Sequence, residues 1–135
     1  MFEVSVEDTF SAGHALRGYK GKCENVHGHN YKVQVVVRGE NIDQKTGMLA
    51  DFVELKRLLR AISEPLDHVF LNDIEPFTTL EPSAENIAWY ICEKMQKGIT
   101  QSNPVEVAEV KVWETDKQFA TFRPDPVSAS TQSSK

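Results

Sequence analysis

Two stretches near the start of the chain alternate between apolar and polar side chains. Their apolar positions are Phe2, Val4, Val6 and Phe10 in residues 2–10, and Tyr31, Val33, Val35 and Val37 in residues 30–38. Successive side chains of a β-strand point to opposite faces of its sheet, so a period of two is typical of a strand with one buried face. The pattern predicts a strand in each stretch.

The middle of the chain has a helical period instead. Residues 52–62 carry apolar side chains three or four positions apart, and a proline follows. Asp51 is a candidate N-cap, with Glu54 at capping-box spacing. A second helix is predicted to begin at Ser83, which is a good N-cap residue, and to end near Gly98.

Strand-like composition returns near the end of the chain, in residues 105–115 and 119–123. The parity of the valines changes between Val107 and Val110. This change indicates a β-bulge near Ala108, because one extra residue shifts every later side chain to the other face.

The order of these elements, ββααββ, predicts the fold class. We expect an α+β domain in which a four-stranded antiparallel sheet carries both helices on one face. The domain is expected to cover residues 1–123. Residues 124–135 are rich in Pro, Ser and Thr without periodicity, which predicts a disordered tail.

Composition narrows the range of functions. The 135-residue chain has a formal net charge of -5, which argues against nucleic acid as a partner, since phosphates demand a basic surface. The sequence contains no apolar run long enough to span a bilayer and no recognisable signal peptide, so we expect a cytoplasmic protein with reduced thiols. Of its two cysteines, Cys92 lies in an apolar stretch that predicts burial, whereas Cys23 lies among histidines.

Three histidines are spaced so that they can share a metal ion. His27 and His29 are two positions apart, so a strand projects both to one face. His14 follows the first predicted strand, and antiparallel pairing of the first two strands brings it beside the other two. Three imidazoles leave one position open, as in catalytic zinc sites. Imidazole also suits iron, copper and nickel, and an isolated His-x-His pair is often only exposed.

Groups that can transfer protons lie near these histidines. Cys23 is either a fourth metal ligand that closes the site or a base or nucleophile beside an open one. Glu24 adds a carboxylate next to it. Asp67 and His68 form a second candidate pair, in which the carboxylate orients the imidazole, unless both lie in a solvated loop.

Two further features are candidates for substrate contacts. Glu114 shares its parity with the valines before it, so it lies either on the buried face at the strand end or at a solvent-facing terminus. On the buried face it would need a partner, and the edge of a guanidine-like heterocycle would be one. Arg17, Lys20 and Lys22 form a basic cluster that either holds phosphates or belongs to a solvated loop.

Six motifs in order resemble those of the 6-pyruvoyl-tetrahydropterin synthase / 6-carboxytetrahydropterin synthase family, along nearly the whole chain up to about Arg123. They are Phe10-Ser-Ala-Gly-His14, Cys23-x3-His27-Gly-His29, Gly47-Met-Leu-Ala-Asp-Phe52, Leu66-Asp-His68 with Leu71-Asn72, Pro82-Ser-Ala-Glu-Asn86 and Val112-Trp-Glu-Thr115. The resemblance implies the tunnelling fold, in which subunits pair their sheets into a barrel. The assembly it implies is a homo-hexamer of two stacked trimers with active sites at subunit interfaces.

The resemblance also implies a substrate, 7,8-dihydroneopterin triphosphate, and a role for each site residue. These roles are zinc binding by His14, His27 and His29, proton transfer by Cys23 as general base with Asp67 and His68, and pterin binding by Glu114 and Ser83. The chain departs from the pattern at Ala84, where many members carry a hydroxyl that helps to hold the pterin.

The same resemblance bears on the product. The three residues between Cys23 and His27 look like the bacterial 6-carboxytetrahydropterin synthases of queuosine biosynthesis, whereas the pyruvoyl-forming animal enzymes have a longer gap. Glu24 looks like a folate-branch subgroup that uses a glutamate in place of the cysteine and releases 6-hydroxymethyl-dihydropterin. The chain has both, like a subgroup that looks bifunctional. We expect mainly the 6-carboxy product with release of acetaldehyde and triphosphate. Another possible class is a non-catalytic metal- or pterin-binding module.

Overall fold

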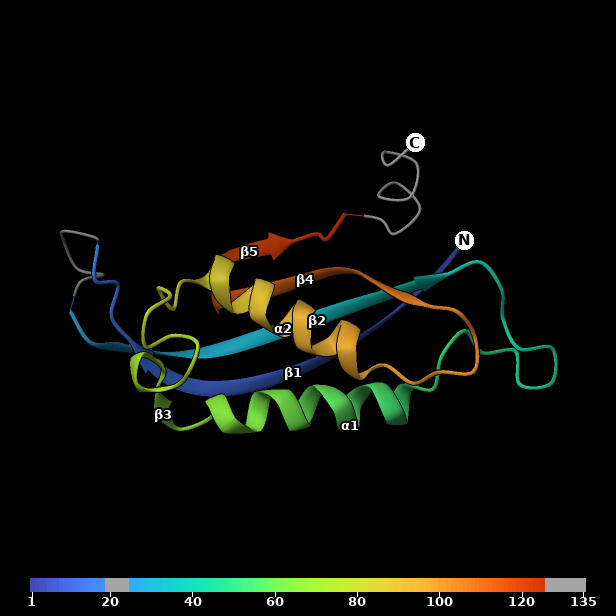
Figure 1. The fold of residues 1–135 in the computed structure, drawn as a ribbon, viewed down its shortest axis with the longest axis horizontal. Helices are drawn as coiled ribbons and strands as arrows, with labels where there is room; N and C mark the ends of the chain where they lie inside the picture. The colour runs from blue at the N-terminus through green and yellow to red at the C-terminus, as the bar shows by residue number, and fades with distance from the viewer. Residues whose placement is uncertain (19–24, 126–135) are drawn as a thin grey trace.

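Five strands form one sheet, and two helices lie against it (Figure 1). The computed structural model describes residues 1–18 and 25–125. In sheet order the strands are β3 (Val69–Phe70), β1 (Phe2–His14), β2 (His27–Gly39), β4 (Glu106–Thr115) and β5 (Gln118–Phe122). The tail predicted to be disordered lies outside the described residues from position 126 onward.

The first two strands pair antiparallel over their whole length, from Phe2 opposite Gly39 to His14 opposite His27. Both are longer than the alternating pattern predicted, because the pairing continues through the small residues between Phe10 and His14, which carry no apolar period. As a result, the ladder ends on two of the candidate metal ligands.

The β-bulge predicted near Ala108 is confirmed. Val36 pairs with Glu109 and Val37 pairs with Val107, so Ala108 has no partner residue opposite it. Beyond the bulge, β4 turns at residues 116–117 into β5, as expected. Because of the extra residue, the even-numbered side chains after the bulge face the same side as Val107 before it. Val110, Val112 and Glu114 therefore lie on the helix-covered face.

The predicted α+β class and the antiparallel pairing of the four predicted strands are confirmed, but the expectation that these four strands make up the whole sheet was wrong. The fifth strand, β3, has only two residues and pairs parallel with β1, with Ala12 opposite Val69. Hydrogen bonds from the preceding residues hold this short strand in place: His68 N–H donates to the Ser11 carbonyl, and Ser11 N–H donates to the Asp67 carboxylate. Two residues are too few to show a period in the sequence.

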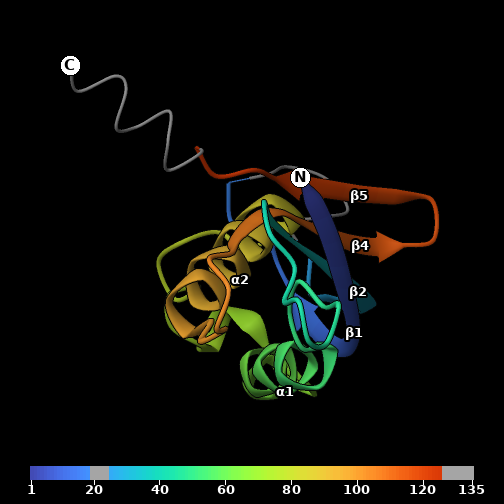
Figure 2. The ribbon, with the colours of Figure 1, turned by 90° about the vertical axis from the view of Figure 1, so that its right-hand side faces the viewer.

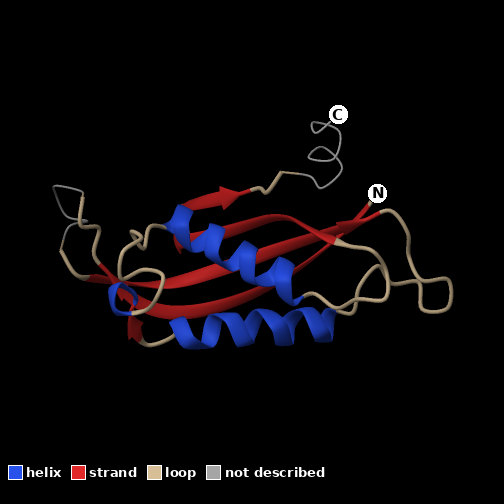
Figure 3. Ribbon diagram, in the orientation of Figure 1, coloured by secondary structure: helices blue, strands red, loops and turns tan. Residues whose placement is uncertain are grey.

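Both helices cover the same face of the sheet, as Figure 2 and Figure 3 show, and their predicted starts are confirmed. They are α1 (Phe52–Ser63) and α2 (Ala84–Gly98). Asp51 caps α1 by accepting from Val53 N–H, and Ser83 caps α2 by accepting from Asn86 N–H. In a capping box the N-cap N–H would also donate to the side chain of Glu54. Here Asp51 N–H donates to the side chain of Gln101 instead, so only one of the two predicted capping bonds forms.

The core lies between the helices and the sheet. Its fully buried members include Tyr31, Leu59, Phe77 and Ile87, and Cys92 is a free, buried thiol as predicted. His14, at the end of β1, is as buried as these apolar residues, with 0% of its surface exposed. Within the described residues, no helix is both long and apolar enough to cross a membrane.

Candidate metal centre

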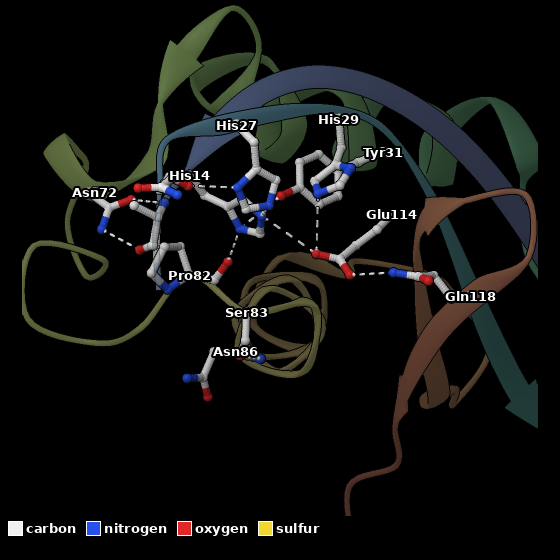
Figure 4. A network of polar contacts seen from close by, with 12 residues as sticks. His14, His27, His29, Tyr31, Asn72, Pro82, Ser83, Asn86, Glu114 and Gln118 are labelled. Atoms are coloured by element: carbon white, nitrogen blue, oxygen red, sulfur yellow. Dashed lines mark hydrogen bonds and ion pairs between the residues drawn. The ribbon is translucent and has the colours of Figure 1, made fainter. Parts of the chain in front are cut away.

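The three predicted histidines converge at one end of the β1–β2 ladder (Figure 4). One ring nitrogen from each of His14, His27 and His29 lies within 4.8 Å of the other two. The Nε2 atoms of His14 and His27 are 2.8 Å apart. The strands supply this convergence directly: His14 pairs with His27 across the ladder, and His29 is two residues further along β2.

Backbone carbonyls fix the orientation of two of the rings. His14 Nδ1 lies 2.7 Å from the carbonyl oxygen of Pro82, and His27 Nδ1 lies 2.8 Å from that of Asn25. A carbonyl oxygen only accepts, so each Nδ1 carries the hydrogen, and in the neutral ring each Nε2 keeps its lone pair. Carbonyl partners of this kind are the usual outer support of metal-binding histidines.

Burial keeps two of the donors, His14 and His29, in the neutral form that a metal requires. Desolvation lowers the pKa of His14 and of His29, while the nearby Glu114 carboxylate opposes the shift. These two imidazoles are therefore neutral at pH 7. In a tetrahedral site with zinc–nitrogen bonds of about 2.0–2.1 Å, ligand nitrogens are about 3.3 Å apart. The three ring nitrogens lie within 4.8 Å of one another, so small side-chain adjustments would bring them to this spacing.

Glu114 lies beside the three imidazoles, on the buried side of the strand end and not on the solvent side. Its Oε2 is 3.6 Å from the Nε2 atoms of both His14 and His29. Its Oε1 accepts a hydrogen bond of 3.1 Å from Gln118 of β5. With 21% of its side chain exposed, the carboxylate can receive a ligand from the open side of the site.

Ser83 lies directly below the imidazoles, one residue after the carbonyl that holds His14 (Figure 4). Its hydroxyl accepts from Asn86 N–H at 3.2 Å and thereby caps α2. A hydroxyl can also donate one hydrogen, so this cap leaves Ser83 able to contact a ligand.

Asp67 and His68 contact each other but not the three imidazoles. His68 Nδ1 is 2.9 Å from Asp67 Oδ1, and the His68 side chain is 82% exposed. His68 nevertheless lines one open pocket of about 420 Å³ together with His29. The structure thus places the pair at the edge of the site and leaves its imidazole facing solvent.

The predicted proton-transfer residues Cys23 and Glu24 lie outside the described residues, as do Lys20 and Lys22. Arg17, the remaining member of the basic cluster, is described. Its guanidinium forms an ion pair of 2.8 Å with Glu81 and donates to the Phe77 carbonyl. In this structure the guanidinium of Arg17 is therefore already engaged by protein partners.

Sequence reasoning assigned no role to Asn72, which supports the segment after His14. Its amide makes two hydrogen bonds to one backbone residue: Oδ1 accepts from Ala15 N–H at 3.0 Å, and Nδ2 donates to the Ala15 carbonyl at 2.8 Å. In the sequence, Asn72 stood out only as part of the family motif Leu71-Asn72, which does not indicate what its side chain binds.

Comparison with known proteins agrees with this geometry. The family model described as 6-pyruvoyl tetrahydropterin synthase matches residues 3–125. The human 6-pyruvoyl tetrahydrobiopterin synthase is 40% identical, with 90% of each chain covered. The 6-carboxy-5,6,7,8-tetrahydropterin synthase of Haemophilus influenzae is 30% identical, covering 91% of this chain and 99% of that protein.

A solved structure shows that the fold is shared as well. The 6-pyruvoyl tetrahydropterin synthase of Caenorhabditis elegans superposes with a TM-score of 0.79 at 35% identity, covering 93% of this chain and 98% of the other. The match spans both helices and the sheet that positions the histidines. The chain therefore belongs to the 6-pyruvoyl tetrahydropterin synthase family.

Proposed function

We propose that residues 1–123 form one catalytic domain that converts 7,8-dihydroneopterin triphosphate and one water molecule to 6-carboxy-5,6,7,8-tetrahydropterin, acetaldehyde and triphosphate. The observation that carries the proposal is the pairing of three converging imidazoles with Glu114 on their open side. The metal is proposed to be zinc, which three histidine ligands and one open position suit. When bound, zinc supplies Lewis acidity that polarises substrate oxygen atoms.

Each remaining residue is proposed to act on the substrate. Glu114 accepts hydrogen bonds from the guanidine-like edge of the pterin, and Gln118 keeps its carboxylate in place. Ser83 adds a hydroxyl contact to the ring, which compensates for the missing hydroxyl at Ala84. Cys23 removes a proton from the substrate side chain as general base. His68, oriented by Asp67, exchanges a second proton.

The spacing between Cys23 and His27 favours the carboxy product. The names of relatives do not separate the possibilities, since synthases named for the pyruvoyl product and for the carboxy product both match over most of the chain. The 40% identity to a pyruvoyl-forming synthase makes 6-pyruvoyl-tetrahydropterin a second candidate product. Glu24 adds a third, 6-hydroxymethyl-7,8-dihydropterin, because a glutamate can replace the thiol as base.

A cytoplasmic homo-hexamer built as two stacked trimers is proposed as the working assembly. Its sheets would pair between subunits into a barrel, since the five-stranded sheet of one chain has two edges and is not closed. The exposed imidazole of His68 supports active sites at subunit contacts. Sedimentation of the purified protein tests this assembly, and a monomer at micromolar concentration would contradict it.

Product analysis tests the reaction. The protein is incubated with zinc and 7,8-dihydroneopterin triphosphate, and the pterins and acetaldehyde are separated by chromatography. The carboxy product and acetaldehyde are expected, and absence of both would refute the main proposal. Cys23→Ala should abolish the carboxy product, whereas Glu24→Gln should abolish only a hydroxymethyl product.

Cobalt substitution tests the alternative function, a non-catalytic binding module. In that module Cys23 would be the fourth ligand of the metal and would leave no open position. A sulfur-to-metal charge-transfer band in the resting protein would make Cys23 a ligand and exclude it as a free base. We expect no such band. The same spectrum should be obtained with Cys23→Ala.

A further inference from the structure

Arg60 of α1 joins the Asp67–His68 pair to β1. Its Nη2 donates to Asp67 Oδ2 at 3.1 Å. Its Nη1 donates to Asp8 Oδ2 at 3.2 Å and to the Thr9 carbonyl at 3.1 Å. A single guanidinium therefore links the helix, the strand that ends in His14 and the residues that precede β3.

Asp67 uses its two carboxylate oxygens for different partners. Oδ1 accepts from Ser11 N–H at 2.9 Å and lies 2.9 Å from His68 Nδ1, while Oδ2 accepts from Arg60. A carboxylate held at both oxygens cannot rotate without breaking one of these bonds. The Ser11 N–H, with the Arg60 and His68 contacts, also holds the pKa of Asp67 below its usual range, so the group stays an acceptor.

His68 depends on this carboxylate for its orientation. Its backbone has a φ of 59°, in the left-handed region that non-glycine residues seldom adopt. Its side chain is 82% exposed, and among the described residues the Asp67 carboxylate is its one polar partner. Since a carboxylate only accepts, the neutral ring must carry its hydrogen on Nδ1, which leaves Nε2 free to take a proton.

We infer that Arg60 is a positioning residue: it locks Asp67 so that His68 is held in the Nδ1–H form with Nε2 available for proton transfer. The role of His68 in turnover rests on the proposed function, but the locked orientation does not. Arg60 is a better lock than a lysine because its planar fork reaches two carboxylates at once.

A purely structural role for Arg60 predicts a different outcome. In that case the contact with Asp8 would matter most, since it ties α1 to β1. Asp8→Asn removes the charge of that partner and leaves Asp67 in place. Arg57 is a matched control, because it lies on the same helix with a single long contact to Glu54 at 3.9 Å and a 72% exposed side chain.

The test uses the full chain and the variants Arg60→Met, Arg60→Lys, Asp8→Asn and Arg57→Met. Nitrogen-15 NMR of the imidazoles reports which ring nitrogen of His68 carries the hydrogen. In Arg60→Met we expect a fall in the Nδ1–H fraction of His68, with partial rescue in Arg60→Lys. Asp8→Asn and Arg57→Met should match the unchanged protein. An unchanged His68 spectrum in Arg60→Met would overturn the inference.

Turnover of 7,8-dihydroneopterin triphosphate adds a second readout. For Arg60→Met we expect kcat to fall about tenfold with KM unchanged, less than the roughly 10²–10⁴-fold that a general acid or base contributes. Equal kcat values for Arg60→Met and Arg57→Met would also overturn the inference. If the unchanged protein turns over no pterin while the His68 spectrum still responds to Arg60→Met, the proposed function fails and the orienting role of Arg60 stands.

Discussion

The Nε2 atoms of His14 and His27 lie 2.8 Å apart, and in the neutral rings both present lone pairs to each other. Their Nδ1 atoms are already committed to the carbonyls of Pro82 and Asn25. Two lone pairs at this distance repel unless a cation lies between or beside them. A metal ion bound by these nitrogens would therefore stabilise the arrangement.

We expect Zn²⁺ to raise the thermal stability of the protein through this site. At a free metal concentration of one hundred times Kd, binding adds about 2.7 kcal/mol to the free energy of unfolding, which corresponds to a rise in Tm of about 10 °C for a domain of this size. Differential scanning calorimetry with and without a chelator measures the shift. His27→Ala should remove it and His68→Ala should retain it, so a full shift in His27→Ala would contradict the assignment.

The carboxylate of Glu114 should contribute to substrate binding but not to metal binding. Loss of a charged hydrogen-bond acceptor costs about 1.5–3 kcal/mol, so Glu114→Gln should weaken binding of the pterin substrate by roughly 10- to 150-fold. Isothermal titration calorimetry measures the substrate affinity, and metal analysis should give an unchanged stoichiometry. A loss of metal in this variant would instead assign the carboxylate to the metal.

Glu109 is a matched control for this change. It lies on the same strand with 17% of its side chain exposed, but its odd parity directs it to the opposite face, where it pairs with Lys111 and Arg123. Glu109→Gln should leave substrate affinity within a factor of about two. Equal effects of the two substitutions would show that Glu114 acts only through the stability of β4.

Asn72 should support the metal centre through the backbone of Ala15. Asn72→Ala leaves the two polar groups of Ala15 without their present partners, which should cost about 1–3 kcal/mol in the free energy of unfolding. Because Ala15 follows His14 directly, zinc affinity should also fall, by about tenfold. Urea unfolding and competition with a zinc indicator measure the two effects.

Asn103 is the control that separates an effect on the metal site from a general loss of stability. Its amide also makes two hydrogen bonds to backbone, donating to the carbonyls of Met48 and Leu49 at the other end of the sheet. Asn103→Ala should lower stability by a similar amount without changing zinc affinity. If both variants lose zinc affinity equally, the two hydrogen bonds from Asn72 to Ala15 have no specific effect on the metal site.

The sequence predicted the elements whose side chains have a clear period. The valines of β2 fixed its buried face, and the change of parity around Ala108 recorded the bulge, because each residue added to a strand reverses the side-chain direction. Strand β3 was not predictable, because its pairing depends on the Asp67 carboxylate and the His68 N–H, which bond to Ser11 from far along the chain.

The site was predictable to a similar extent. The placement of His14 opposite His27 follows from antiparallel pairing, and the common face of His27 and His29 follows from strand parity. The carbonyl of Pro82 and the double contact of Asn72 were not predictable, since backbone carbonyls carry no sequence signal and an amide can bond almost any exposed backbone group.

Burial of His14 should make the stability of the metal-free protein depend on pH. Desolvation lowers its pKa below the ordinary value of 6.5, and in the unfolded chain the same ring returns to that value. The unfolded state therefore binds more protons as the pH falls below 6.5, so the free energy of unfolding should decrease in that range and level off once the folded-state ring is also protonated.

Urea unfolding in the presence of a chelator, at about pH 7.5, 6.5 and 5.5, measures this dependence. His14→Gln should flatten the loss of stability, although not completely, because the pKa of His29 is lowered by burial as well. If His14→Gln and the unchanged protein lose stability equally between about pH 6.5 and 5.5, the buried imidazole is not the titrating group. The acid sensitivity would then arise from the carboxylates that pair on the surface.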